Sequence, residues 1–99
     1  MATPLTDATA QRIARMFPSS AQELVSSVLI EECGDNLTTH SALIERIRIA
    51  VLKLSGGDLN ALQRAIDLAK TDWRDALMAA GFGTNVAAHL SWWPDPPKR

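Results

Sequence analysis

The sequence is poor in cysteine, in runs of basic residues and in long apolar stretches. Cys33 is the one cysteine among 99 residues, so no disulfide can form within the chain, as is typical of reducing compartments. A helix needs about 20 apolar residues to span a bilayer, and no segment approaches that length. Residues 1–10 have neither a basic start nor an apolar stretch, so no signal peptide is expected. These absences predict a cytoplasmic protein without membrane contact.

The charges are balanced, which argues against a nucleic-acid partner. Ten Lys or Arg residues face eleven Asp or Glu residues, for a net charge of −1, and no block of like charge occurs. Nucleic-acid binders usually carry a basic stripe, because neutralised phosphates supply much of their affinity. A helix-turn-helix would read DNA with residues 72–80, yet Asp72 and Asp75 near the start of that segment would repel phosphates. We therefore expect no nucleic-acid binding.

Apolar residues recur at spacings of three and four along most of the chain, which is the helical pattern. No alternating run of useful length and no hairpin signal appears. The fold class predicted is all-α, a compact orthogonal bundle of five to six short helices. One domain is expected over residues 1–99, with tails at 1–5 and 94–99. The expected helices lie near residues 7–16, 20–33, 38–54, 59–69, 72–80 and 84–91.

Capping and helix-ending residues set the expected bounds of the first three helices. Thr6 should cap the first, and the Ser20–Glu23 segment reads as a capping box for the second. Gly34 should end the second helix in the left-handed conformation. The third should begin near Thr38 or Thr39, with Arg48 among its mostly outward charges. Helices two and three are apolar over more than half their girth, which predicts a central position or a second buried contact.

Similar signals bound the later helices. Asp58 should cap the fourth helix and Thr71 the fifth, whose first residue is Asp72. Gly81 followed by Phe82 predicts a Schellman stop, with Phe82 folding back on the helix end.

The segment Asp72-Trp73-Arg74-Asp75-Ala76-Leu77-Met78-Ala79-Ala80-Gly81-Phe82 resembles a pattern of small, uncharacterised bacterial helical proteins. With the residues just before it, the resemblance covers about a quarter of the chain. It implies a bacterial origin and transfers no function and no site residue.

Few residues offer reactive chemistry. Cys33 could meet His40, seven residues on, as a nucleophile–base pair, but Cys33 also continues an apolar stripe and is better explained as a core residue. No Cys-x-x-Cys, His-x-x-x-His or Glu-x-x-His spacing suggests a metal site, and no phosphate loop is present. We expect no catalytic residue, no metal and no cofactor.

The tryptophans are the most informative residues. Trp73 lies at the centre of an apolar helix face and is expected in the core. Trp92, Trp93 and Pro94 form a different group, because residues near a chain end are usually polar. Adjacent helical positions point about 100° apart, so one face cannot bury both tryptophans. Either one seals the core while the other lies in a surface groove, or at least one marks a partner surface.

The sequence thus favours a non-enzymatic interaction module that binds a protein partner or forms a homodimer. The expected partner surface is Trp92, Trp93 and Pro94. The alternative is a small ligand-binding or catalytic domain. Its pocket would lie near His89, Trp92 and Trp93, or near Cys33 and His40.

Overall fold

A computed structural model describes residues 3–94, and over that range the chain is helical with no β-strand. The all-α prediction is confirmed, and the number of described helices lies within the predicted range. The helices are α1 (Asp7–Met16), α2 (Ser19–Glu32), α3 (Ser41–Ser55), α4 (Leu59–Ala79) and α5 (Ala88–Ser91).

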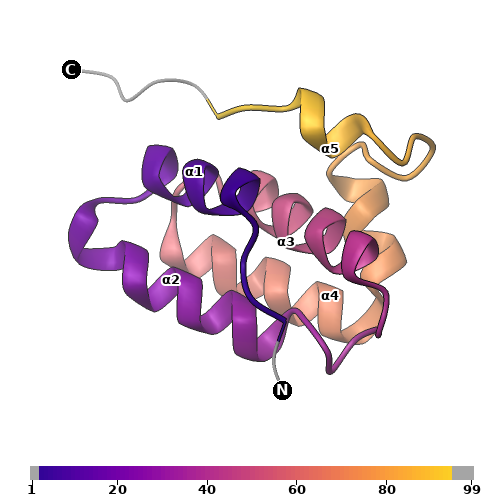
Figure 1. The fold of residues 1–99 in the computed structure, drawn as a ribbon, viewed down its shortest axis with the longest axis horizontal. Coiled ribbons are helices and arrows are strands. Elements are labelled where there is room, and N and C mark those ends of the chain that lie inside the picture. The colour runs from indigo at the N-terminus through magenta and orange to yellow at the C-terminus, as the bar shows by residue number, and fades with distance from the viewer. Residues whose placement is uncertain (1–2, 95–99) are drawn as a thin grey trace.

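Helix α3 is the centre of the bundle. It packs along α4 and also contacts α1 and α5, while α2 contacts α1 and α4 (Figure 1). Its buried residues are Ile44, Ile47, Arg48, Ile49, Ala50, Val51, Leu52 and Ser55. Helix α2 is peripheral by comparison, because Leu24 on its outer side is 56% exposed. Of the two helices expected at the centre, α3 is there, whereas α2 instead contacts two neighbours, α1 and α4, as the second alternative allowed.

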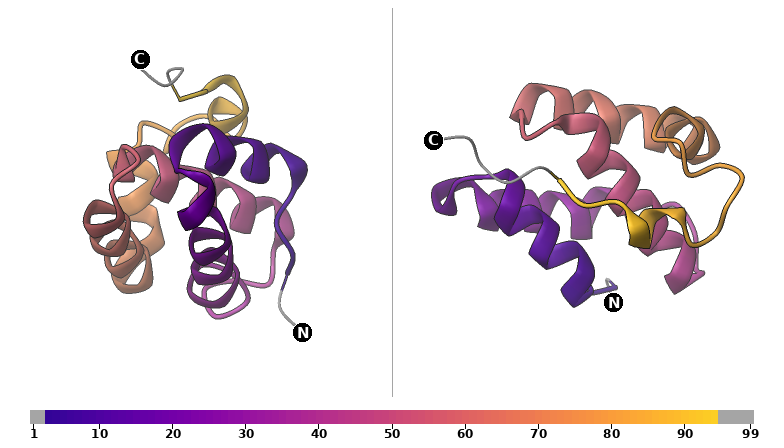
Figure 2. Two further views of the ribbon diagram at one scale, coloured as in Figure 1. Left: turned by 90° about the vertical axis from the view of Figure 1, so that its left-hand side faces the viewer. Right: turned by 90° about the horizontal axis from the view of Figure 1, so that it is seen from above.

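The segment after α4 returns across the bundle. Figure 2 shows this C-terminal stretch passing over α3 toward α1, so residues near opposite ends of the chain meet. The N-terminal stretch runs the other way, from α1 down to the α2–α3 loop (Figure 1). Both ends of the described chain therefore lie against helices rather than projecting from them.

The first two helices start differently from one another. Thr6 caps α1 as predicted, since its hydroxyl accepts a hydrogen bond from the Thr9 amide. The capping box expected at Ser20 is wrong, because α2 begins one residue earlier and Pro18 is its cap residue, without a side-chain hydrogen bond. The Ala21 and Gln22 amides both donate to Pro18 O, so the first turn of α2 forms without a capping hydroxyl.

Gly34 follows the end of α2, but it does not adopt the left-handed backbone conformation. The described glycines with positive φ are Gly56, Gly57 and Gly81, so the left-handed cap predicted at Gly34 is wrong. A β-carbon at Gly34 would instead lie 2.7 Å from Nη2 of Arg48. The missing side chain makes room for a buried guanidinium.

Helix α3 starts later than predicted, and its charged residue Arg48 is buried. It begins at Ser41, and its cap residue His40 makes no side-chain capping bond. Arg48, expected to point mostly outward, is 2% exposed. Its guanidinium donates to the carbonyl oxygens of Cys33, Pro4 and Thr3 at 2.7, 3.0 and 2.8 Å.

Helix α4 contains the predicted break. Asp58 caps it, with its carboxylate accepting from the Ala61 amide at 2.8 Å. The backbone leaves helical geometry at Asp72, where φ is −157° and ψ is 101°. Asp72, rather than Thr71, then acts as the internal cap, because its carboxylate accepts from the Arg74 amide. The break lies one residue beyond the expected one.

The Schellman stop after α4 is confirmed. Gly81 has φ of +83°, the Phe82 amide donates to Leu77 O, and the Gly81 amide donates to Met78 O. Phe82 is buried, as expected. The last helix is shorter than predicted, because residues 84–87 form bends and turns and only Ala88–Ser91 is helical.

Candidate functional site

A buried arginine fastens the C-terminal segment to α1. Arg12 is 1% exposed, and its guanidinium donates to the carbonyl oxygens of Trp92, His89 and Leu90. The shortest of these bonds, from Nη2 to Trp92 O, is 2.8 Å, and Nη1 also donates to Ala8 O at 2.8 Å. Burial lowers the pKa of Arg12, although nearby Glu45 acts in the opposite direction. A single side chain thus fixes where the last described residues lie.

Trp93 stacks on two arginines. The guanidinium carbon of Arg12 lies 3.7 Å from the ring centroid of Trp93, and that of Arg15 lies 4.8 Å from it. These are cation–π distances. Trp93 nevertheless remains 39% exposed. The ring is therefore oriented by its neighbours while part of its surface stays open to solvent.

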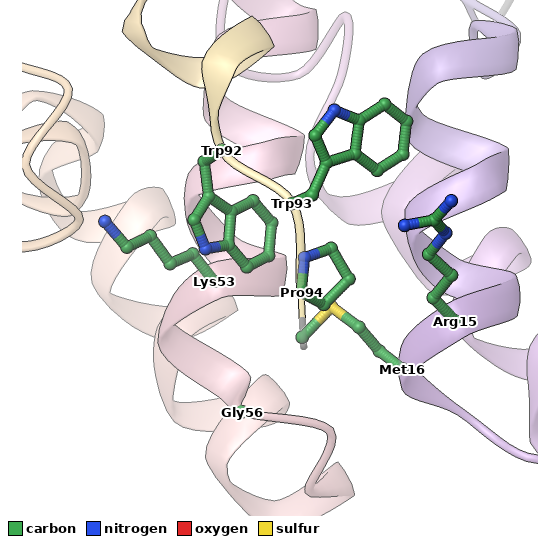
Figure 3. A pocket seen from close by; sticks show the side chains of 7 residues that line it. All are labelled: Arg15, Met16, Lys53, Gly56, Trp92, Trp93 and Pro94. Atoms are coloured by element: carbon green, nitrogen blue, oxygen red, sulfur yellow. The ribbon is translucent and has the colours of Figure 1, made fainter. Parts of the chain in front are cut away.

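The two tryptophans border one cleft of about 490 Å³ (Figure 3). We call it the tryptophan cleft; its lining residues are Arg15, Met16, Lys53, Gly56, Trp92, Trp93 and Pro94. Helix α1 supplies one wall, the end of α3 the opposite wall, and the C-terminal segment lies between them. The predicted partner residues therefore share one concavity with residues from two other elements.

The cleft is cationic and aromatic. Arg15 directs its guanidinium toward Trp93, whereas the ammonium of Lys53 donates to Ala80 O at 2.7 Å (Figure 3). Across residues 3–94, no carboxylate oxygen lies within 4.0 Å of the nitrogens of either side chain. The positive charge of Arg15 thus has no counter-charge among the described residues.

The tryptophans divide between core and surface. Trp92 is half-buried and packs against the core cluster, and Trp93 lies in the cleft beside it. This arrangement is compatible with both interpretations of the pair, because Trp92 packs on the core while Trp93 lies in a cleft and stays 39% exposed. Trp73, expected in the core, is only partly buried and borders a second concavity.

His89 does not line the tryptophan cleft. Its ring is buried, with Nε2 located 3.1 Å from Oε1 of Glu45 on α3 and the ring edge-on to Phe82. The predicted alternative pocket of His89 with Trp92 and Trp93 is therefore wrong: the histidine faces α3, while the tryptophans line the cleft between α1 and the end of α3.

Cys33 and His40 do not form a reactive pair. Cys33 is fully buried, and burial raises its pKa to about 12. His40 is exposed, and no hydrogen bond joins its ring to any residue in the described range. The Cys33–His40 pocket predicted as part of the alternative is not present, because the thiol is sealed in the core.

Residues 3–94 contain no group of three or more His, Cys, Asp or Glu placed to hold a metal ion. In the same stretch, no helix is both long enough and apolar enough to cross a membrane.

Sequence reasoning missed Arg12 and Arg48 as organising residues. Each lies at helical spacing from buried residues: Arg12 is three residues after Thr9, and Arg48 is four residues from Ile44 and Leu52. Position on the apolar face was the available signal. This signal is weak because charged residues are seldom buried unless paired, and here the partners are backbone carbonyls rather than carboxylates.

The tryptophan cleft is thus the site where a rigid aromatic ring, an unpaired cation and a concave surface coincide. A comparison of the chain with protein-family models, curated proteins and solved structures finds no match in any of the three.

Proposed function

We propose that this protein is a non-enzymatic interaction module that binds a protein partner in the tryptophan cleft. The observation that carries the proposal is Trp93, a large aromatic side chain held in place by two guanidinium groups and still partly exposed. Tryptophan and arginine are the residue types most enriched at the energetic centres of protein interfaces.

Rigidity supports this role. A side chain that is ordered before binding loses little conformational entropy when a partner covers it. Arg12 holds the backbone at Trp92, and stacking orients the ring of Trp93. The partner would therefore meet a preformed surface.

The chemistry of the cleft favours an acidic, partly apolar segment of the partner. Arg15 offers a guanidinium without a carboxylate partner among residues 3–94, and such a group forms strong paired hydrogen bonds with Asp or Glu. Trp93, Met16 and Pro94 offer apolar contact next to it. A short peptide with an acidic residue beside an aliphatic or proline residue would satisfy both.

Peptide selection tests this proposal. We would select from a library of random displayed peptides against the immobilised protein and expect enrichment of acidic residues next to apolar ones. Selected peptides should bind the Trp93→Ala variant at least about tenfold more weakly, since truncation of an interface tryptophan commonly costs more than 2 kcal/mol. Affinities would be measured by fluorescence anisotropy.

Leu24→Ala provides the control, because Leu24 is exposed on α2 and does not line the tryptophan cleft. It should leave the affinity unchanged, and both variants should keep the circular dichroism of the parent. Equal binding to Trp93→Ala and parent, or a selection without enrichment, would contradict the proposal. A mass that rises with protein concentration and depends on Trp93 would identify a second copy of the chain as the partner.

We also propose a bacterial cytoplasmic setting without nucleic-acid binding. The single cysteine, the balanced charge and the resemblance of residues 72–82 support it. Duplex DNA binding at micromolar concentration and low salt would contradict the last part.

A further inference from the structure

A second concavity, separate from the tryptophan cleft, lies between α3 and the C-terminal segment. We call it the α3–α5 groove; it has a volume of about 590 Å³ and is bordered by α3, by Trp73 of α4 and by residues 86–90. Figure 1 shows α5 and the preceding loop beside the first half of α3. The volume is within the range of small-molecule sites.

Apolar side chains dominate this groove. Leu43 and Trp73 lie in it partly buried, while Val86 and Leu90 are 74% and 49% exposed on its rim. Two large aliphatic side chains thus lie open to solvent beside one groove. An apolar molecule placed there would remove these side chains from water.

Arg46 supplies the polar end of the groove. Its Nη2 donates to Phe82 O at 2.8 Å, its Nε is buried without a hydrogen-bond partner in the described chain, and Nη1 makes no hydrogen bond to residues 3–94. No carboxylate oxygen of residues 3–94 lies within 4.0 Å of this guanidinium. Most buried polar atoms in proteins are hydrogen-bonded, so an arginine with this many unused donors is unusual.

The other ionisable groups of the groove do not cancel this charge. Glu45 is the one acid that lines it, and its carboxylate lies against the buried ring of His89. His89 Nδ1, like Arg46 Nε, is buried without a partner in the described range. His40 lies exposed at the opposite rim. Arg46 is thus a cation of the groove with no ion-pair partner among residues 3–94, whereas the one acid, Glu45, contacts His89.

We propose that the α3–α5 groove binds a small amphipathic anion, with its carboxylate on Arg46 and its apolar body along Leu43, Trp73 and Leu90. The site is independent of the tryptophan cleft, because the two concavities share no lining residue. A medium-chain fatty acid has the required combination of one carboxylate and one flexible apolar chain.

Nuclear magnetic resonance titration of the whole chain tests the proposal. Decanoate, added below its micelle concentration, should shift the amide signals of residues 42–46 and 86–90 and the indole N–H of Trp73 in a saturable way. The indole signals of Trp92 and Trp93 should stay in place. Decanol and decylammonium, which have the same apolar chain without the negative charge, should bind about tenfold more weakly, because the charge-assisted hydrogen bond to Arg46 is lost.

Arg46→Gln should remove the preference for decanoate over decanol, and Arg46→Lys should retain part of it. Arg74→Gln is the matched control: Arg74 stacks on Trp73, with its guanidinium 5.3 Å from the ring centroid, but does not line the groove. Equal affinity of the parent protein for decanoate and decanol would overturn the proposal without any variant. Shifts confined to Trp92–Pro94, or shifts that never saturate, would overturn it as well.

Discussion

Arg12 alone supplies hydrogen bonds to three backbone carbonyl groups of the C-terminal segment. An aliphatic side chain in its place would fill the same space yet leave the carbonyl groups of His89, Leu90 and Trp92 without donors. Backbone carbonyls buried without hydrogen bonds cost about 1–3 kcal/mol each. The buried charge is tolerated because its donors are occupied, which makes Arg12 a structural residue rather than a catalytic one.

Replacing Arg12 by Met should therefore lower the free energy of unfolding by about 3 kcal/mol, since the lost hydrogen bonds outweigh the relief of burying a charge. Urea denaturation followed by circular dichroism measures this. Arg64→Met, at an exposed position, should change the value by less than about 0.5 kcal/mol. Equal losses in the two variants would show that the Arg12 network contributes nothing.

Cys33 predicts a specific dependence of stability on pH. Its pKa rises from the ordinary value of 9.0 to about 12 on burial, so the folded thiol keeps its proton where the unfolded thiol ionises. The contribution to stability is complete below pH 9.0 and is lost as pH rises from 9.0 toward 12. The unfolding free energy of the parent should fall more steeply across that window than that of Cys33→Ala. Parallel curves would refute this account.

At the scale of the elements, several local signals predicted helix ends correctly, although the equally local capping box at Ser20 did not. Thr6, Asp58 and the Gly81–Phe82 stop each act within one turn of their own helix, and all three are confirmed. The predictions for Gly34 and Arg48 are wrong because they depend on a contact between residues distant in sequence: the glycine leaves room for an arginine fourteen residues later in the chain. No helical periodicity encodes that approach.

The turn between α3 and α4 allows a matched test of two glycines. Gly56 and Gly57 both have positive φ, +58° and +85°. A β-carbon at Gly57 would lie 2.9 Å from the carbonyl oxygen of Met16, whereas one at Gly56 would meet nothing within 4 Å.

Gly56→Ala should therefore cost about 1 kcal/mol, the left-handed strain alone. Gly57→Ala should cost at least about 1 kcal/mol more, because it must also displace the end of α1. Thermal unfolding of both variants provides the comparison. A smaller loss for Gly57→Ala than for Gly56→Ala would disprove the close approach to Met16.

On the scale of the whole molecule, two buried arginines each hold one end of the described chain. The Arg48 guanidinium donates hydrogen bonds to carbonyl oxygens of residues 3–4 and of the residue that follows α2. The Arg12 guanidinium donates to carbonyl oxygens within residues 89–92. The sequence singled out Trp92, Trp93 and Pro94 as a candidate partner surface, and the three residues line one cleft. It could not predict the opposite walls of the cleft, because Arg15 and Lys53 reach it only after residues distant in sequence have folded together.

Because the two arginines hold different ends of the chain, replacing each one should increase local unfolding in a different region. Arg48→Met should speed hydrogen exchange at the amides of Leu37 and Thr38, which donate to Gly34 O next to the Arg48 site, and leave the Leu90 amide unchanged. Arg12→Met should do the reverse. Mass spectrometry of exchanged peptides resolves the two regions, and acceleration of both by either variant would mean that the ends open together.

The acceptors of Arg12 are main-chain oxygens, and every amino acid has one. The clamp on residues 89–92 therefore does not depend on which side chains those positions carry toward solvent, Leu90 and Ser91 in particular. New side chains at these two positions would be displayed on an unchanged backbone path. The outward face of this segment can thus be redesigned to bind a chosen target while the bundle beneath it stays intact.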